Sequence, residues 1–168
     1  MNRCSILCVL SAFIVVAGCN RFTPLTKDLA PTASLTLYEG LPHQYFEAEL
    51  LEKELDAKKT ITIHGFPFYE RPLLVSAADV AELRGLFAAQ DSFSPYRGPK
   101  KCGGFHPDYC LLWQDGERKY ELLICFGCHE MKFFAPQDEA IADIQADALA
   151  RFEAILKKYR DQRPKQEE

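Results

Sequence analysis

Residues 109–126 read YCLLWQDGERKYELLICF and set the fold class of the chain. Two apolar, β-prone runs, at residues 109–113 and 120–126, flank the dipeptide Asp115-Gly116. Such a dipeptide between two strand-like runs is typical of a tight turn that joins antiparallel strands. The stretch therefore predicts a β-hairpin. If the turn is centred on residues 115–118, Cys110 lies opposite Leu123 and diagonal to Cys125 on the same face.

The flanking sequence predicts further strands and helices around this hairpin. Alternating or apolar runs indicate strands at residues 35–37, 59–64 and 131–135. Apolar residues at helical spacing indicate helices at residues 45–57, from a Ser76–Asp79 capping box to about residue 90, and at residues 141–159. We therefore predict an α+β fold. A small, mostly antiparallel sheet of four or five strands is packed by two or three helices, and the long C-terminal helix is the main cover.

The first residues, MNRCSILCVLSAFIVVAGC, have the features of a bacterial lipoprotein leader. Arg3 precedes an apolar run that is short for a membrane span, and residues 16–19 (VAGC) resemble a lipobox. We expect a signal peptide at residues 1–18, a lipidated Cys19 and a tether to residue 34. A single domain follows at residues 35–160, and then a frayed, charged tail at residues 161–168. In the lipoproteins that this leader resembles, Asp after the lipidated cysteine tends to retain the protein at the inner membrane. The resemblance therefore implies that Asn20 at this position mildly favours the outer membrane.

Composition limits the partners that the chain can have. The 168 residues fit one domain, and their net charge of −4 becomes −5 once the leader with Arg3 is removed. This acidity argues against nucleic-acid binding, which needs a basic face. Membrane attachment would come from the lipid, with the domain in the periplasm. The sequence identifies no protein or small-molecule partner.

Cysteine and histidine are concentrated in one region of the predicted domain. Of the seven cysteines, Cys4 and Cys8 leave with the leader and Cys19 carries lipid. An even set remains: Cys102, Cys110, Cys125 and Cys128. Structural disulfides are the leading interpretation, because the compartment permits them. Cys110 could pair with Cys125 and Cys102 with Cys128, but a Cys125–Cys128 bond competes, and three connectivities stay open.

Two cofactor sites are alternatives to disulfides. Zinc could be held by the four cysteines, or by Cys102, His106, Cys125 and Cys128. Residues 125–129 read CFGCH, which matches the CxxCH attachment site of c-type haem, with Cys125 and Cys128 as thioether donors and His129 as iron ligand. Either centre could serve redox chemistry or electron transfer. No cofactor remains the first expectation.

An enzymatic role has little support in the sequence. A CxxC that catalyses thiol exchange usually lies at a helix N-terminus, whereas Cys125 ends a predicted strand. Asp108 could orient His106, although loop carboxylates more often accept hydrogen bonds from nearby amides. No nucleophile or acid–base constellation stands out, and we single out no catalytic residue. The sequence thus favours an envelope domain whose Cys/His cluster is structural, with the zinc or haem centre as the alternative.

Four segments together resemble an uncharacterised family of predicted bacterial envelope lipoproteins. They are residues 37–43 (LYEGLPH), 65–69 (GFPFY), 102–109 (CGGFHPDY) and 124–130 (ICFGCHE), and the resemblance spans about residues 35–160. In that family a cysteine, a Phe/His-Pro segment, a hairpin and a CxxC occur together. The resemblance implies no activity. Relatives whose CxxC lacks the following histidine imply that haem is not a family property.

Overall fold

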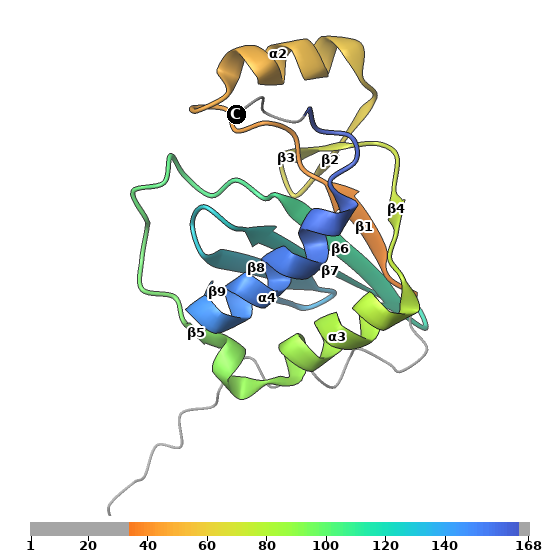
Figure 1. Cartoon of the computed structure of the whole chain (residues 1–168). Coiled ribbons are helices and arrows are strands. Elements are labelled where there is room, and N and C mark those ends of the chain that lie inside the picture. Colours follow the sequence, from red (N-terminus) through yellow and green to blue (C-terminus); the bar gives the residue numbers. More distant parts are fainter. Residues whose placement is uncertain (1–33, 165–168) are drawn as a thin grey trace, which may run out of the picture.

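The computed structural model of the chain describes residues 34–164, and an antiparallel sheet lies at its centre (Figure 1). The expected hairpin forms the middle of this sheet, with β6 at Tyr109–Asp115 and β7 at Arg118–Cys125. Cys110 pairs with Leu123, so the predicted register is confirmed. The predicted signal peptide, Cys19 and nearly all of the tether lie outside the described residues.

Five further strands extend the hairpin on both sides. β1 (Thr36–Glu39) and β4 (Leu73–Leu74) lie beyond β6, while β8 (Glu130–Ala135), β9 (Asp138–Ile144) and β5 (Phe93–Pro95) lie beyond β7. The strand order is therefore β4-β1-β6-β7-β8-β9-β5. The α+β class is confirmed, but the seven strands exceed the expected four or five. β4 and β5 have two and three residues, too few to show a period-two pattern.

The C-terminal helix is shorter than the sequence predicted. Helix α4 runs over Ala146–Leu156 and continues as the 3-10 turn η2 (Lys157–Tyr159). The predicted start at residue 141 is wrong, because Ile141 and Ile144 belong to β9. Both residues fit a helical stripe with Ala148, but residues 138–144 also suit a strand, and their pairing with β8 decides the outcome.

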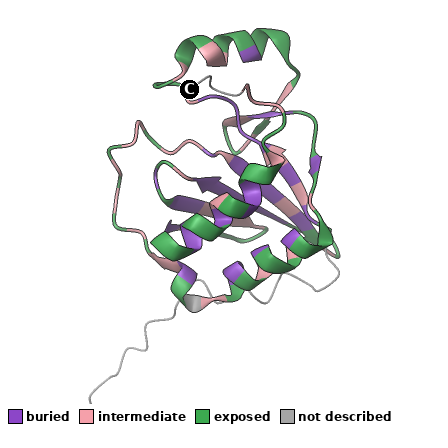
Figure 2. Ribbon diagram, in the orientation of Figure 1, coloured by how far each residue is buried: buried purple, intermediate pink, exposed green. Residues whose placement is uncertain are grey.

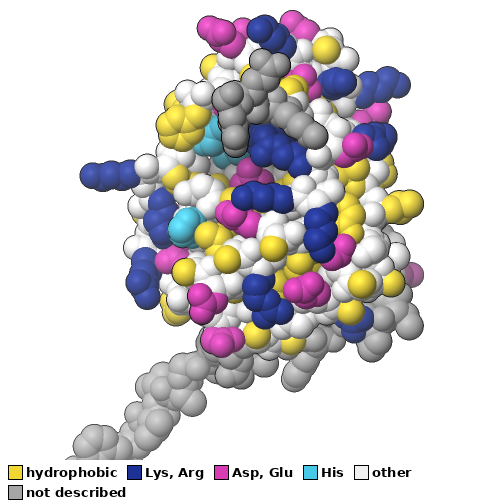
Figure 3. All heavy atoms as spheres, viewed as in Figure 1, with side chains coloured by type: hydrophobic (Ala, Val, Ile, Leu, Met, Phe, Trp, Pro, Cys, Tyr) yellow, Lys and Arg dark blue, Asp and Glu magenta, His cyan; other side chains and the backbone are white. Residues whose placement is uncertain are grey.

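Helices α3 (Ala77–Ala88) and α4 cover one face of the sheet and enclose the main core with it (Figures 1 and 2). Trp113 and Tyr120 of the hairpin lie at its centre, and Trp113 stacks against Phe87 of α3 at 6.5 Å between ring centroids. The 3-10 turn η1 (Gln90–Ser92) links α3 to β5. Basic and acidic side chains are interspersed on the outer surface of these helices (Figure 3), as expected for a solvated face.

Asp79 joins the start of α3 to the end of α4. The Ser76 hydroxyl accepts a hydrogen bond from the Asp79 amide at 3.1 Å, so the predicted helix cap is confirmed. The Asp79 carboxylate accepts from the Tyr159 hydroxyl at 2.6 Å and from Lys158 Nζ at 2.8 Å. These bonds, with that of Lys158 foremost, lower the pKa of the Asp79 carboxyl to about 2.

Acid should weaken this junction, and Asp79→Asn should remove the effect. Because the folded pKa lies below the unfolded value near 4, Asp79 stabilises the fold above that pH and loses this contribution as pH falls towards 2. Urea unfolding from pH 7 to pH 2 should show wild type more stable than Asp79→Asn at neutral pH, with the difference shrinking below about pH 4. A difference that stays constant across the range would contradict this assignment.

A second hairpin covers part of the opposite face of the sheet. It pairs β2 (Thr60–Ile63) with β3 (Phe66–Tyr69), which confirms the predicted strand at residues 59–64. Phe68 of β3 packs on Cys110 and Leu123 in a small buried cluster. Helix α2 (Ala48–Ala57) lies above this hairpin, and its Glu54 accepts a hydrogen bond from the Tyr69 hydroxyl at 2.8 Å (Figure 1). Within residues 34–164, no helix is long and apolar enough to cross a bilayer.

Candidate functional site

The segments rich in cysteine and histidine meet at one end of the sheet. Glu39 at the end of β1 pairs with Tyr109 at the start of β6, and Tyr109 also pairs with Ile124 near the end of β7. Three loops therefore start or finish side by side. They are residues 40–47 after β1, residues 96–108 before β6, and residues 126–129 between β7 and β8.

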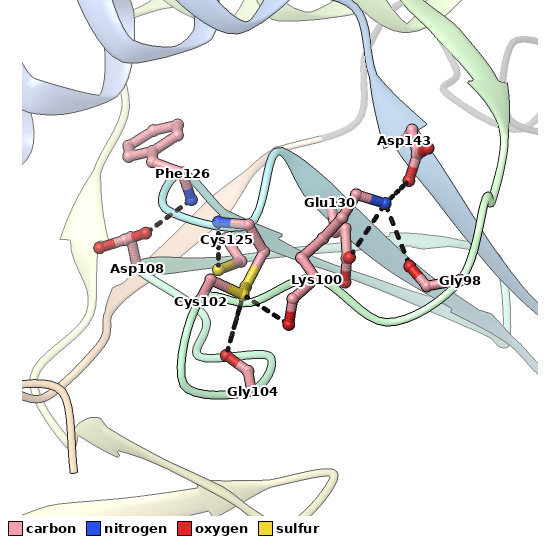
Figure 4. Close-up of a disulfide and its surroundings, with 10 residues drawn as sticks. Gly98, Lys100, Cys102, Gly104, Asp108, Cys125, Phe126, Glu130 and Asp143 are labelled. Carbon is pink, nitrogen blue, oxygen red and sulfur yellow. Dashed lines mark hydrogen bonds and ion pairs between the residues drawn. A yellow bond between two sulfur atoms is a disulfide. The ribbon is translucent and has the colours of Figure 1, made fainter. Parts of the chain in front are cut away.

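A disulfide between Cys102 and Cys128 ties two of these loops together (Figure 4). The Cα atoms of the two residues are 5.6 Å apart, within the usual range for a cystine. The carbonyl oxygen of Gly104 lies 3.6 Å from Cys102 Sγ and 3.2 Å from Cys128 Sγ. One carbonyl oxygen therefore contacts both sulfurs of the bond.

Cys110 and Cys125 are free and buried, so the second expected disulfide is not formed. Their diagonal placement explains why. Diagonal residues on paired strands have Cα atoms about 7–8 Å apart, whereas a cystine needs about 4.4–6.8 Å. Burial raises the pKa of the Cys110 thiol to about 12 and that of Cys125 to about 11. Both thiols are therefore protonated at neutral pH and are poor nucleophiles.

The cystine uses a sulfur that both cofactor alternatives require. Cys128 cannot form a haem thioether or bind zinc as a thiolate while it is bonded to Cys102. Among the described residues, no three His, Cys, Asp or Glu side chains converge in a way that could hold a metal ion. His129 lies in the tight turn after Cys128 with a φ of 55°, and its amide donates to the Phe126 carbonyl at 3.2 Å.

A half-buried lysine and two buried carboxylates fix the loop on the other side of the cystine. Lys100 Nζ lies 2.7 Å from Asp143 Oδ1 and 3.4 Å from Glu130 Oε1, and these carboxylates face each other on β9 and β8 (Figure 4). The hydrogen bond to Asp143 is the main cause of a raised pKa at Lys100. Lys100 therefore neutralises two carboxylates that the fold holds out of water, two residues before Cys102. Neither Glu130 nor Asp143 is among the site residues expected from the sequence.

Two of the four histidines come together beside the cystine. The rings of His43 and His106 are 4.7 Å apart between centroids. His43 Nδ1 accepts a hydrogen bond from the Tyr45 amide at 3.1 Å, which places the proton of a neutral ring on Nε2, and this buried atom has no hydrogen-bond partner. Gly103 makes room for the ring, because a Cβ there would lie 2.8 Å from His43 Cε1. Burial is the main cause of a lowered pKa at His106, so its ring is neutral at pH 7.

Asp108 stabilises the loop itself and does not orient His106 through a direct hydrogen bond. Its Oδ2 accepts from the Phe126 amide at 2.7 Å, and its backbone carbonyl accepts from the Gly40 amide at 2.8 Å. Burial raises the pKa of the Asp108 carboxyl. Asp108 is therefore a loop carboxylate that accepts a hydrogen bond from a nearby backbone amide, which is the second of the two roles expected from the sequence.

Three charged residues that sequence reasoning missed complete the site. Arg163 forms ion pairs with Glu47 and, at 3.6 Å, with Asp108, and its side chain is only 10% exposed. Glu39, at the end of β1, accepts hydrogen bonds from backbone amides at residues 161–163. The expected fraying of the tail therefore does not apply to these residues. No local pattern marks these contacts, since Glu39 and Glu47 lie more than 110 positions from their partners in the tail.

Comparisons with protein-family models, with curated proteins and with solved structures gave no match to this chain. The chemistry of the site must therefore be argued from its own residues. Its thiols are protonated and His106 is neutral, while its charged groups are paired with one another. Such an arrangement suits a rigid, preformed surface better than acid–base or thiol catalysis.

Proposed function

We propose that the chain is a lipid-anchored binding domain of the bacterial cell envelope, without catalytic activity of its own. In this proposal Cys19 carries the lipid, the domain faces the periplasm, and Asn20 favours the outer membrane. The Cys102–Cys128 cystine is the observation that carries it. A cystine that joins two loops belongs in an oxidising compartment, and the leader sequence is expected to direct the chain to one.

The role of the cluster in this proposal is to keep a surface in one conformation. The cystine, the Lys100 cluster and the Asp108–Phe126 hydrogen bond each fix a loop that has no regular secondary structure. Loops held in the bound conformation lose less entropy when a partner binds, which raises affinity. The zinc and haem alternatives would each require Cys128 as a free thiol.

Metabolic labelling with a fatty acid tests the anchor. The wild-type chain should carry the label and fractionate with membranes, whereas Cys19→Ser should lose the label and leave the membrane fraction. Cys8→Ser, which changes a cysteine of the predicted leader, is the matched control and should be labelled like wild type. An unlabelled wild-type chain would refute the lipid anchor.

Thiol titration of the purified chain tests the state of the cluster. In denaturant without reductant, Cys110 and Cys125 should react, and Cys102 and Cys128 should react only after reduction. Stoichiometric zinc or a Soret band would overturn the structural interpretation in favour of a metal or haem centre.

A further inference from the structure

The C-terminal strap, defined as residues 160–163, crosses the candidate site after η2 and bends at residues 162 and 163. The Glu39 carboxylate accepts hydrogen bonds from the amides of Gln162 at 2.8 Å and of Asp161 and Arg163 at 3.2 Å. Glu39 is only 2% exposed, so these bonds form in a largely water-free place. Three successive amides can point at one carboxylate only where the backbone bends, and a bent segment of almost any sequence can supply such amides.

Arg163 adds a side-chain element to this recognition. Its guanidinium enters a pocket between Glu47 and Asp108, which lie on two different loops of the site. Planar guanidinium groups suit such a pair of carboxylates better than ammonium groups do. The fit is incomplete, because Arg163 Nε is buried without a hydrogen-bond partner. An arginine placed slightly differently could satisfy this donor.

The rest of the strap is held by surface contacts. Asp161 pairs with Arg71, and both side chains are about 60% exposed. Gln162 Nε2 donates to the Arg71 carbonyl at 3.1 Å. Exposed ion pairs of this kind stabilise little. Release of the strap would therefore cost mainly the contacts of Glu39 and of the guanidinium, which an equivalent segment could replace.

Exposed aromatic side chains lie beside the pocket. Tyr45 is 69% exposed and Phe46 is 72% exposed, and they directly precede Glu47 in the chain. Aromatic residues around a buried charged pocket are typical of the energetically important part of protein interfaces. This surface lies at the end of the sheet where β1 finishes, away from the start of β1 where the tether joins the domain (Figure 1).

We propose that the Glu39–Glu47–Asp108 pocket is a docking site for a bent, arginine-containing segment of a partner protein, and that the strap occupies it in cis. The inference rests on the proposed function, because it names the partner chemistry of that binding surface. The strap then acts as an internal competitor. If it is released in about 1% of molecules, the wild-type chain binds the partner segment about 100-fold more weakly than an open site would.

A peptide with the sequence of residues 159–164, YRDQRP, tests the site in trans against the full chain. Arg163→Ala empties the guanidinium pocket and should bind this peptide at least about tenfold more tightly than wild type, measured by calorimetry. Arg151→Ala removes an exposed arginine of α4 that pairs with Glu82, outside the strap and the pocket, and it should bind like wild type. The peptide YRDQAP should bind neither variant, because it lacks the arginine that enters the pocket.

A second measurement needs no variant and guards against misfolding of Arg163→Ala. Titration of excess peptide into isotope-labelled wild-type chain should move the amide resonances of residues 161–163 to random-coil positions while core resonances stay unchanged. Unmoved strap resonances, or equal affinity of wild type and a folded Arg163→Ala, would overturn the proposal. Fatty-acid labelling and the thiol count are independent of this result, so the proposed function could stand while the docking site fails.

Discussion

Alanine at Gly40 should destabilise the domain by about 3 kcal/mol or more, the largest effect expected of any single methyl group added to it. A Cβ at this position would overlap the carbonyl oxygen of Pro107 and lie 3.1 Å from that of Asp108. Both obstacles are backbone atoms, and the Gly40 amide donates to the Asp108 carbonyl at 2.8 Å. Neither side of the contact can move without breaking the junction between β1 and the loop before β6. Urea unfolding of Gly40→Ala and wild type measures the loss.

Gly85→Ala is the matched control for this substitution. Gly85 lies within α3, and a Cβ there would meet no atom within 4 Å. Because alanine is a better helix former than glycine, this variant should gain about 0.5–1 kcal/mol. If Gly→Ala lowers the free energy of unfolding at position 40 and raises it at position 85, the loss at position 40 comes from the contact with Pro107. A loss below about 1 kcal/mol at Gly40 would show that the loops are not rigid.

The central hairpin was predictable because its information is local. Two apolar runs and a turn dipeptide lie within residues 109–126, and they fixed the pairing of Cys110 with Leu123. The sequence places residues 141–144 in the wrong element because Ile141 and Ile144 satisfy a helical period as well as a strand. The neighbour that makes them a strand is β8, and such pairing is a tertiary contact that periodicity does not encode.

The candidate site was predictable only where it depends on this hairpin. The register placed Cys102 near Cys128, and these residues form the disulfide. The same register suggested a Cys110–Cys125 bond, but a diagonal pair is too widely spaced for a cystine. Arg163 and Glu47 gave no signal, because a solvated charged segment and a buried ionic contact have the same composition. A charged residue at the end of the buried strand β1 was the one clue to Glu39.

Removal of the cystine should be the second large effect on stability. Cys102→Ala/Cys128→Ala opens a bond between residues 26 positions apart. In the loop-entropy account, a closed loop of this length stabilises the fold by about 3–4 kcal/mol. Thermal unfolding should therefore show Tm lower by roughly 10 °C. A reducing agent should lower the Tm of wild type in the same way and leave that of the double variant unchanged.

Cys110→Ala/Cys125→Ala separates loss of the cystine from loss of buried sulfur. Both residues lie in the interior, so this variant should lose some packing energy, but a reducing agent should still lower its Tm as it does that of wild type. If reduction leaves wild type unaffected, the cystine does not hold the loops. The Lys100 cluster and the Asp108–Phe126 hydrogen bond would then carry the rigidity that the binding proposal requires.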